Sequence, residues 1–132
     1  MVFSKIVETC IYFPDLDKMK EFYQKKLGLE LISKKENRHL FFKVGDSMLL
    51  IFNPKVTMNE KDIIHGALSP PTMIHFAFQI SKNDFRLAKQ NILSKNIPAE
   101  KEVTWSNGAQ SMYFRDPAGN LVEIITDDAW PI

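Results

Sequence analysis

The chain has 132 residues, 45% hydrophobic and 25% charged, and its 17 basic and 16 acidic residues leave a formal net charge of +1. A chain of this length can bury a core without disulfides, and the balanced charge gives no field that attracts nucleic acid or an acidic membrane surface. No stretch approaches the roughly 20 apolar residues of a membrane span. We therefore expect a cytoplasmic globular protein that binds neither nucleic acid nor membranes, and the single cysteine, Cys10, fits a reducing compartment.

The first part of the chain reads as one strand, one helix and three further strands. Residues 6–13 are rich in β-branched and aromatic side chains, as strands are, and Glu8 is their only charge. A cap at Asp15, apolar residues at helical spacing and Gly28 together predict a helix over residues 16–27. Turn residues then separate three expected strands, at residues 30–34, 39–44 and 48–52.

The same order of elements then returns after a linker. Residues 54–71 are polar, hold three prolines and lack a sustained period, apart from one candidate helical turn at residues 61–65. After them we expect a strand at 73–80, a helix whose apolar face is Phe85, Ala88, Ile92 and Leu93, a strand at 99–104, and a hairpin of strands 111–115 and 120–126. We therefore expect one domain with two βαβββ modules, at about residues 1–53 and 72–128, joined by the linker 54–71.

Aligning the two modules brings out three candidate metal ligands. The strand-to-helix boundaries set Glu8 opposite His75, and the last strands set Leu50 opposite Glu123. Alternation along the last strand leaves Glu123 among apolar neighbours, where a carboxylate is costly unless it faces water or pairs with a cation or a metal. Two carboxylates and an imidazole suit Mn²⁺, Fe²⁺, Co²⁺, Ni²⁺ or Zn²⁺. The alternative is that all three are solvated side chains on the wet face of a sheet.

Two motifs add a family resemblance that covers almost the whole chain. The segments FYxxxLGLxL, from Phe22 to Leu31, and FRDPxGNxxE, from Phe114 to Glu123, together with the repeat, resemble the vicinal oxygen chelate superfamily of glyoxalase I, extradiol dioxygenases and bleomycin-binding proteins. The resemblance implies an α+β fold in which two βαβββ modules form a cupped mixed sheet with a helix packed on each module. It also implies one divalent metal held by Glu8, His75 and Glu123. Many members have histidine at the Glu8 position, and Leu50 leaves three protein ligands rather than four.

Alternation also places several other side chains on the inner faces of the expected cup: Cys10, Tyr12, Gln79, Ser111, Tyr113 and Arg115. The candidate catalytic residues are Glu8, as a base, with Tyr113 and Arg115. Arg115 would hold a substrate carboxylate or phosphate, or else pair with Asp116 or Asp128, and Tyr113 would touch the ligand or pack with its hydroxyl in water. We expect Cys10 to be a buried filler, His39 and His65 to lie at the surface, and the loop from Trp105 to Gly108 to cover the cup.

Two functions remain open from the sequence. The leading hypothesis is a glyoxalase-like, metal-dependent lyase, isomerase or thiol transferase that acts on a small oxygenated organic molecule. The alternative is a metal-free protein that binds an antibiotic or metabolite in the same cup. The resemblance further implies a homodimer, because small cups in this superfamily are often completed by a partner subunit.

Overall fold

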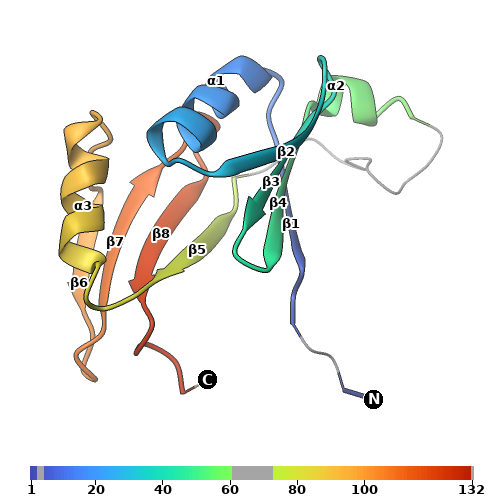
Figure 1. Cartoon of the computed structure of the whole chain (residues 1–132). Helices are drawn as coiled ribbons and strands as arrows, with labels where there is room; N and C mark the ends of the chain where they lie inside the picture. Colours follow the sequence, from blue (N-terminus) through green and yellow to red (C-terminus); the bar gives the residue numbers. More distant parts are fainter. Residues whose placement is uncertain (3–4, 61–72, 132) are drawn as a thin grey trace. The chain divides into compact units, whose positions relative to one another are not determined.

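The computed structural model describes residues 1–2, 5–60 and 73–131, and the chain divides into two compact units, residues 1–72 and 73–132. Each unit holds one mixed sheet of four strands, and a helix follows the first strand of each sheet (Figure 1). The strand orders are β1-β4-β3-β2 and β5-β8-β7-β6, so the first and last strands of each unit lie side by side and parallel. The expected α+β fold with two βαβββ modules is confirmed.

The first unit begins with β1 (Glu8–Tyr12), α1 (Leu16–Lys20) and η1 (Glu21–Lys26). The Asp15 carboxylate caps α1 by accepting from the Lys18 N–H at 3.1 Å, as the sequence predicts. The predicted single helix is wrong in its second part, because η1 is a π-helical turn and the Leu27 N–H bonds to the carbonyl of Phe22, five residues back, at 3.0 Å. Phe22 and Tyr23 are both buried in this turn.

Three antiparallel strands complete the first sheet: β2 (Glu30–Lys35), β3 (His39–Val44) and β4 (Ser47–Phe52). The segment predicted as linker starts instead with a short helix, α2 (Pro54–Thr57). Asn53 caps it by accepting from the Lys55 N–H at 3.1 Å, and Pro54 occupies the first turn, where its missing N–H costs nothing. The predicted helical turn at residues 61–65 lies outside the described residues.

The second unit holds β5 (His75–Ile80), α3 (Phe85–Ser94), β6 (Lys101–Thr104), β7 (Gln110–Arg115) and β8 (Leu121–Thr126). Phe85 and Ile92 of α3 are buried, but Leu93, predicted on the same face, is 43% exposed. The helix ends one residue later, and Asn96 turns the chain with a φ of 61° so that Ile97 is buried instead. No helix within the described ranges is long and apolar enough to cross a membrane.

The register of the two sheets shows that the units correspond residue by residue. In the first unit Glu8 lies opposite Met48 and Cys10 opposite Leu50. In the second, His75 lies opposite Leu121 and Ala77 opposite Glu123. The structure therefore confirms the sequence correspondence of Glu8 with His75 and of Leu50 with Glu123.

Candidate functional site

The hairpin turn between β7 and β8 fixes where the candidate ligands stand. One oxygen of Asp116 accepts from the backbone N–H groups of Ala118 and Asn120, each at 2.9 Å, and the other accepts from the Asn120 side chain at 2.8 Å. The Asn120 side-chain oxygen in turn accepts from the N–H of Ile74 at 2.9 Å. Ile74 precedes β5, so this buried network sets the start of β5 against β8. The register that puts His75 near Glu123 follows from it.

His75 and Glu123 form a close pair on the second sheet. His75 Nε2 lies 3.2 Å from Glu123 Oε1, with the imidazole half exposed and the carboxylate almost fully buried. His75 Nδ1 lies 3.0 Å from the Leu121 carbonyl oxygen, which can only accept, so Nδ1 carries a proton and donates it. This bond fixes the ring and leaves Nε2 facing the carboxylate. A ring nitrogen oriented in this way by a backbone carbonyl is the arrangement typical of histidine metal ligands.

The second oxygen of Glu123 gives a test of whether a metal fits. Among the described residues, Oε2 is a buried side-chain oxygen with no hydrogen-bond partner. An unsatisfied buried carboxylate oxygen is costly, and a cation bound there would satisfy it. The donor set of one imidazole and one carboxylate is also that of borderline divalent metals. The residues present therefore fit a divalent cation, although within neither unit do three described His, Cys, Asp or Glu side chains converge.

Tyr113 stands directly opposite Glu123 in the β7–β8 register and contributes a hydroxyl to the site. Partial burial raises the pKa of its phenol, and the nearby charge of Glu123 and a hydrogen bond to that carboxylate raise it further. Tyr113 therefore stays protonated at neutral pH and acts as a hydrogen-bond donor rather than as a base. Ser111, also expected on this face, is buried, and its hydroxyl accepts from the Trp105 indole N–H at 2.9 Å. Ser111 thus holds the Trp105 ring.

A cavity of about 580 Å³ opens over these residues within the second unit. Its lining is mainly aromatic and small apolar, and its polar residues are His75, Ser106, Asn107, Tyr113 and Glu123. The complete set of lining residues is His75, Phe76, Ala77, Trp105, Ser106, Asn107, Tyr113, Glu123, Ile125, Ala129 and Trp130. The predicted loop from Trp105 does border the cavity. The sequence did not predict Trp130, Ala129 and Phe76 as lining residues. Trp130 and Ala129 lie beyond the repeat, and the alternation of β5 assigns Phe76 to the face opposite to that of His75.

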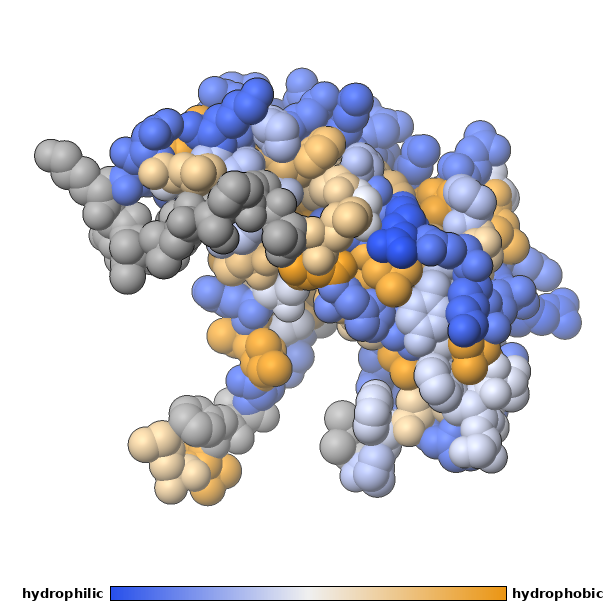
Figure 2. All heavy atoms as spheres, turned by 180° about the vertical axis from the view of Figure 1, so that it is seen from behind, coloured by the Kyte–Doolittle hydropathy of each residue, from blue (hydrophilic) through white to orange (hydrophobic). Residues whose placement is uncertain are grey.

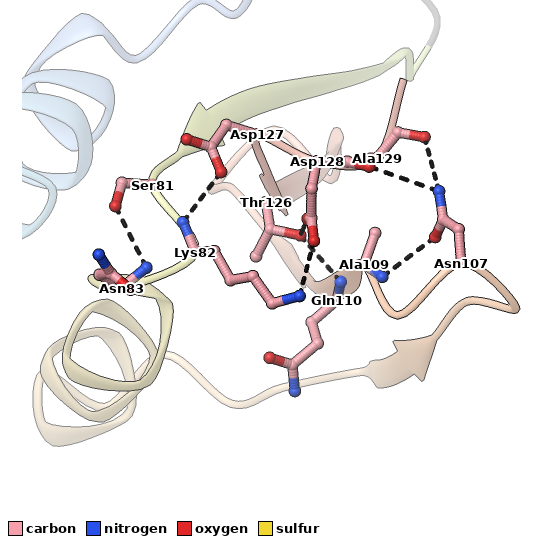
Figure 3. A network of polar contacts seen from close by, with 10 residues as sticks. All are labelled: Ser81, Lys82, Asn83, Asn107, Ala109, Gln110, Thr126, Asp127, Asp128 and Ala129. Carbon is pink, nitrogen blue, oxygen red and sulfur yellow. Dashed lines mark hydrogen bonds and ion pairs between the residues drawn. The ribbon is translucent and has the colours of Figure 1, made fainter. Parts of the chain in front are cut away.

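A polar network joins the two segments that border the cavity, and two of its members, Asn107 and Ala129, also line the cavity (Figure 3). The Asn107 side-chain nitrogen donates to the Ala129 carbonyl at 3.1 Å, and its oxygen accepts from the Ala109 N–H at 3.0 Å. The Asp128 carboxylate accepts from Lys82 Nζ at 2.8 Å and from the Thr126 hydroxyl at 2.6 Å. Together these contacts attach the chain after β8 to the loop between β6 and β7.

Arg115 lies apart from this cavity. Its guanidinium binds Glu100 through two nitrogens, at 2.6 and 3.0 Å, and donates to the Gly119 carbonyl at 3.1 Å. The partner is therefore Glu100 rather than Asp116 or Asp128, which the sequence had suggested. Arg115 does not line the cavity of the second unit.

Glu8 lies on the first unit, where it is exposed and shares a face of β1 with Cys10. The prediction that Cys10 is buried is wrong: it is a free, exposed cysteine, because Ile11 rather than Cys10 points into the core. Partial desolvation and then the charge of Glu8 raise the pKa of its thiol, which keeps it in the unreactive protonated form.

The prediction that His39 lies at the surface is wrong as well. His39 is buried, with its ring stacked on Phe41 at 4.0 Å between centroids, and its Nδ1 lies 2.6 Å from Arg38 Nη1. His39 occupies the position in β3 that corresponds to Ser111 in β7, and both side chains are buried. His65 lies outside the described residues.

Comparison with known proteins identifies the family of the chain. The family model of the Glyoxalase/Bleomycin resistance protein/Dioxygenase superfamily matches residues 5–124. The chain belongs to this superfamily. Superfamily members typically use divalent metals and bind small molecules. No curated protein matches the chain significantly.

Solved structures of the superfamily resemble the chain over nearly its whole length. A lactoylglutathione lyase from Agrobacterium tumefaciens is 36% identical, with a TM-score of 0.86 and 98% of each chain covered. A glyoxalase/bleomycin resistance protein/dioxygenase from Nocardioides is 20% identical, with a TM-score of 0.77 and coverage of 100% of this chain and 90% of that one. A virulence protein from Salmonella typhimurium is 24% identical, with a TM-score of 0.74 and coverage of 96% and 98%. The latter two show the fold alone.

Proposed function

We propose that the protein is a metal-dependent enzyme of the glyoxalase type that acts on a small oxygenated organic molecule, as a lyase, isomerase or thiol transferase. The observation that carries the proposal is the buried, unpartnered Oε2 of Glu123 beside an imidazole nitrogen already oriented toward the same carboxylate. The similarity to a lactoylglutathione lyase supports the reaction class. His75 and Glu123 would hold the metal, Mn²⁺, Fe²⁺, Co²⁺, Ni²⁺ or Zn²⁺, and we propose Glu8 as the third protein ligand.

The roles of the residues follow from their surroundings. A bound divalent metal would supply Lewis-acid stabilisation of a substrate oxygen. The Leu121 carbonyl holds the His75 Nδ1 proton and so keeps Nε2 available toward the site. The protonated hydroxyl of Tyr113 would donate to a substrate oxygen that gains negative charge. Glu8 would accept a proton from a substrate carbon when it is not a permanent ligand, and Arg115, paired with Glu100, would act only if a substrate anion displaced that carboxylate.

The decisive measurement is thermal unfolding of chelator-treated protein with Mn²⁺, Fe²⁺, Co²⁺, Ni²⁺, Zn²⁺ or Mg²⁺ added singly. A ligand at a hundredfold excess over its Kd stabilises the folded state by about 2.7 kcal/mol, which in a protein of this size raises Tm by on the order of 10 °C. We expect such a rise with at least one transition metal, and we expect Glu123→Gln and His75→Ala to abolish it. Glu102→Gln, a change of an exposed carboxylate on β6, is the matched control and should keep the full rise.

Activity distinguishes an enzyme from a protein that only binds. The metal-loaded protein should turn over one member of a panel of α-oxo aldehydes with thiols, including glutathione, and of epoxides. Glu123→Gln should lower turnover by several orders of magnitude, because the lost metal removes several kcal/mol of transition-state stabilisation. Glu8→Gln tests the assignment of Glu8: an unchanged metal affinity together with unchanged turnover would contradict it. Unfolding that ignores every metal would overturn the proposal as a whole.

One observation favours the alternative of a metal-free binding protein. The cavity of the second unit is walled mainly by aromatic and apolar side chains and has a volume in the range of small-molecule sites, about 580 Å³. Such a site can sequester an antibiotic or metabolite without any reaction. In that case binding of the molecule would be as tight in Glu123→Gln as in the unmodified protein, provided that the cavity keeps its shape.

We propose that the protein is a homodimer in the cytoplasm. The support for the dimer is the exposure of apolar residues near the N-terminus, because Met1, Val2 and Ile6 are almost fully exposed. Figure 2 shows hydrophobic side chains at the surface of that end of the chain. A second copy of the chain would cover such side chains. Light scattering after size-exclusion chromatography measures the mass in solution, and a monomer mass at all concentrations would contradict the dimer. The free Cys10 supports the reducing compartment.

A further inference from the structure

Four side chains of the second unit form one hydrogen-bond network that runs from the loop before β7 to the proposed metal ligand Glu123. The Trp105 indole nitrogen donates to the Ser111 hydroxyl oxygen at 2.9 Å. The Ser111 hydroxyl bonds in turn to the Tyr113 phenol, and that phenol bonds to the Glu123 carboxylate. Trp105, Tyr113 and Glu123 line the cavity, so this Trp105–Glu123 network connects one side of the cavity to the proposed metal site.

The sheet places Ser111 and Tyr113 where these bonds can form. The two residues lie two positions apart on β7 and therefore share one face of the sheet, and Glu123 lies directly opposite Tyr113. The Ser111 side chain is buried, and its cross-strand neighbours are Val103 and Ile125, whose side chains cannot form hydrogen bonds. A buried hydroxyl without partners is costly, and Trp105 and Tyr113 satisfy this one.

The two ends of the Trp105–Glu123 network fix the direction of its bonds. An indole N–H can only donate and an ionised carboxylate can only accept, so the Tyr113 hydroxyl donates to Glu123 and the Ser111 proton lies toward the phenol oxygen. The pKa of Tyr113 agrees with this direction. Burial and then Glu123 raise this pKa, whereas the hydrogen bond of Ser111 lowers it, as a donor to the phenol oxygen does.

We infer that Trp105 and Ser111 are positioning residues of the proposed site, which keep the hydroxyl proton of Tyr113 directed into the cavity. The inference rests on the proposed function, because it takes Tyr113 as the donor to a substrate oxygen. While the Ser111 proton occupies a lone pair of the phenol oxygen, the Tyr113 proton cannot turn toward Ser111 and stays available to the substrate. Successive hydrogen bonds also polarise one another, so the indole N–H makes the phenol a better donor.

Nuclear magnetic resonance of chelator-treated protein tests the network without metal or turnover. Tyr113→Phe removes the hydroxyl and keeps the ring, and it should shift the ¹H signal of the Trp105 indole N–H upfield, as a weakened hydrogen bond does. The signal of Trp130, which lines the same cavity outside the network, should stay in place. In the opposite direction, Trp105→Phe should move the ¹³Cζ signal of Tyr113 and leave those of Tyr12 and Tyr23 unchanged.

An unmoved Trp105 signal in Tyr113→Phe would overturn the inference, and so would equal movement of both indole signals, which would indicate a general change of the cavity. Trp105 is 43% exposed, so Trp105→Phe provides the test even if Ser111→Ala does not fold.

Turnover of the metal-loaded protein separates positioning from support of the fold. Trp105→Phe keeps an aromatic ring in the cavity and removes the N–H donor, so it should lower kcat about tenfold and change KM by less than about twofold. Ser111→Ala should do the same, and Ser111→Thr, which keeps the hydroxyl, should restore most of kcat. Ser94→Ala, which removes an exposed hydroxyl at the end of α3, is the matched control.

The double variant gives the sharpest result. Tyr113→Phe alone should lower kcat about a hundredfold, and adding Trp105→Phe should lower it no further, because the indole N–H acts only through the phenol. Losses that multiply in the double variant would overturn the inference. Failure of the metal and turnover experiments would overturn the proposed function and leave the magnetic resonance result standing, whereas an unmoved Trp105 signal leaves the proposed metal site intact.

Discussion

At the scale of single residues, the buried carboxylate of Glu123 is the feature that local folding does not explain. An apolar residue would fit at this buried position of β8, as the corresponding residue of the first unit, Leu50, shows by being apolar and buried. One of its oxygens faces His75 and the other has no hydrogen-bond partner among the described residues. A group that destabilises the free protein in this way is expected where function requires it.

Glu123→Gln should therefore stabilise the metal-free protein. The amide has nearly the same shape and removes a buried charge whose second oxygen has no hydrogen-bond partner among the described residues, so we expect the free energy of unfolding to rise by about 1 kcal/mol. Urea unfolding of chelator-treated protein measures this change. Glu102→Gln, which removes an exposed ion pair with Lys89, should change the same quantity by less than about 0.5 kcal/mol. A clear loss of stability in Glu123→Gln would mean that the carboxylate is satisfied without a metal.

Asp128 gives the segment before Trp130 a dependence on pH. A hydrogen bond from Lys82, and then one from Thr126, lower the pKa of the Asp128 carboxyl below its usual value. Because the pKa of Asp128 is lower in the folded state, its ionised carboxylate stabilises the folded state at pH values above the unfolded-state pKa. This stabilisation is lost as the pH falls through the folded-state pKa. Asp127, which accepts from the Lys82 N–H at 3.1 Å, is a second carboxylate beside this pair.

We accordingly expect the Trp130 indole signal to move toward that of a flexible tail as the solution is acidified below the ordinary aspartate range. ¹H–¹⁵N spectra recorded along an acid titration measure this movement. Asp128→Asn should show the shifted position already at neutral pH, and Asp46→Asn, a change of an exposed carboxylate on the first unit, should leave the titration unaltered. A Trp130 signal that stays constant through the titration would contradict the role of Asp128.

At the scale of elements, the β7–β8 hairpin turn determines the geometry of the site more than either strand does. Asn120 is buried and connects the turn to Ile74, directly before β5. The residues Asp116, Pro117, Gly119 and Asn120 predict a turn from sequence, because each has a known preference for such positions. The contact with Ile74, 46 residues away, carries no local signal, and only the fold reveals it.

Asn120→Ala should destabilise the protein by about 2–3 kcal/mol, because it leaves the Ile74 N–H and one Asp116 oxygen without their buried partner. The same change should also weaken metal binding, since β5 would no longer start in register with β8. Chemical denaturation and the metal-dependent shift in Tm measure the two effects. Asn91→Ala, on an exposed position of α3, should change neither. Weakened stability with unaltered metal affinity would show that the turn does not position His75.

The helices mark the limit of what local patterns predict. Apolar spacing correctly located the segments around α1 and α3, because both bury one stripe of apolar residues against a sheet. It could not foresee η1, because an α-helix and a π-helix place Phe22 and Tyr23 on similar faces over so few residues. It also assigned Leu93 rather than Ile97 to the core, since the left-handed turn at Asn96 that brings Ile97 back is decided by packing.

At the scale of the whole molecule, the repeat made much of the site predictable. Matching the modules gave Glu8, His75 and Glu123 as candidate ligands, and the parallel pairing of β5 with β8 brings His75 and Glu123 together. The aromatic cavity was not predictable to the same degree, because Trp130 has no counterpart in the first unit and lies after the last strand. Glu8 stays a prediction, supported by its equivalence to His75 in register.

The strand order has a consequence for how activity should depend on protein concentration. Both β1, with Glu8, and β5, with His75, are edge strands, so among the described residues each has one strand partner in its own sheet and a second side on which a further strand could pair. Whatever segment adds along β5 will set its side chains next to His75. If that segment comes from another molecule, turnover per molecule should fall on dilution instead of staying constant, and the concentration at half activity would measure how tightly the added strand is held.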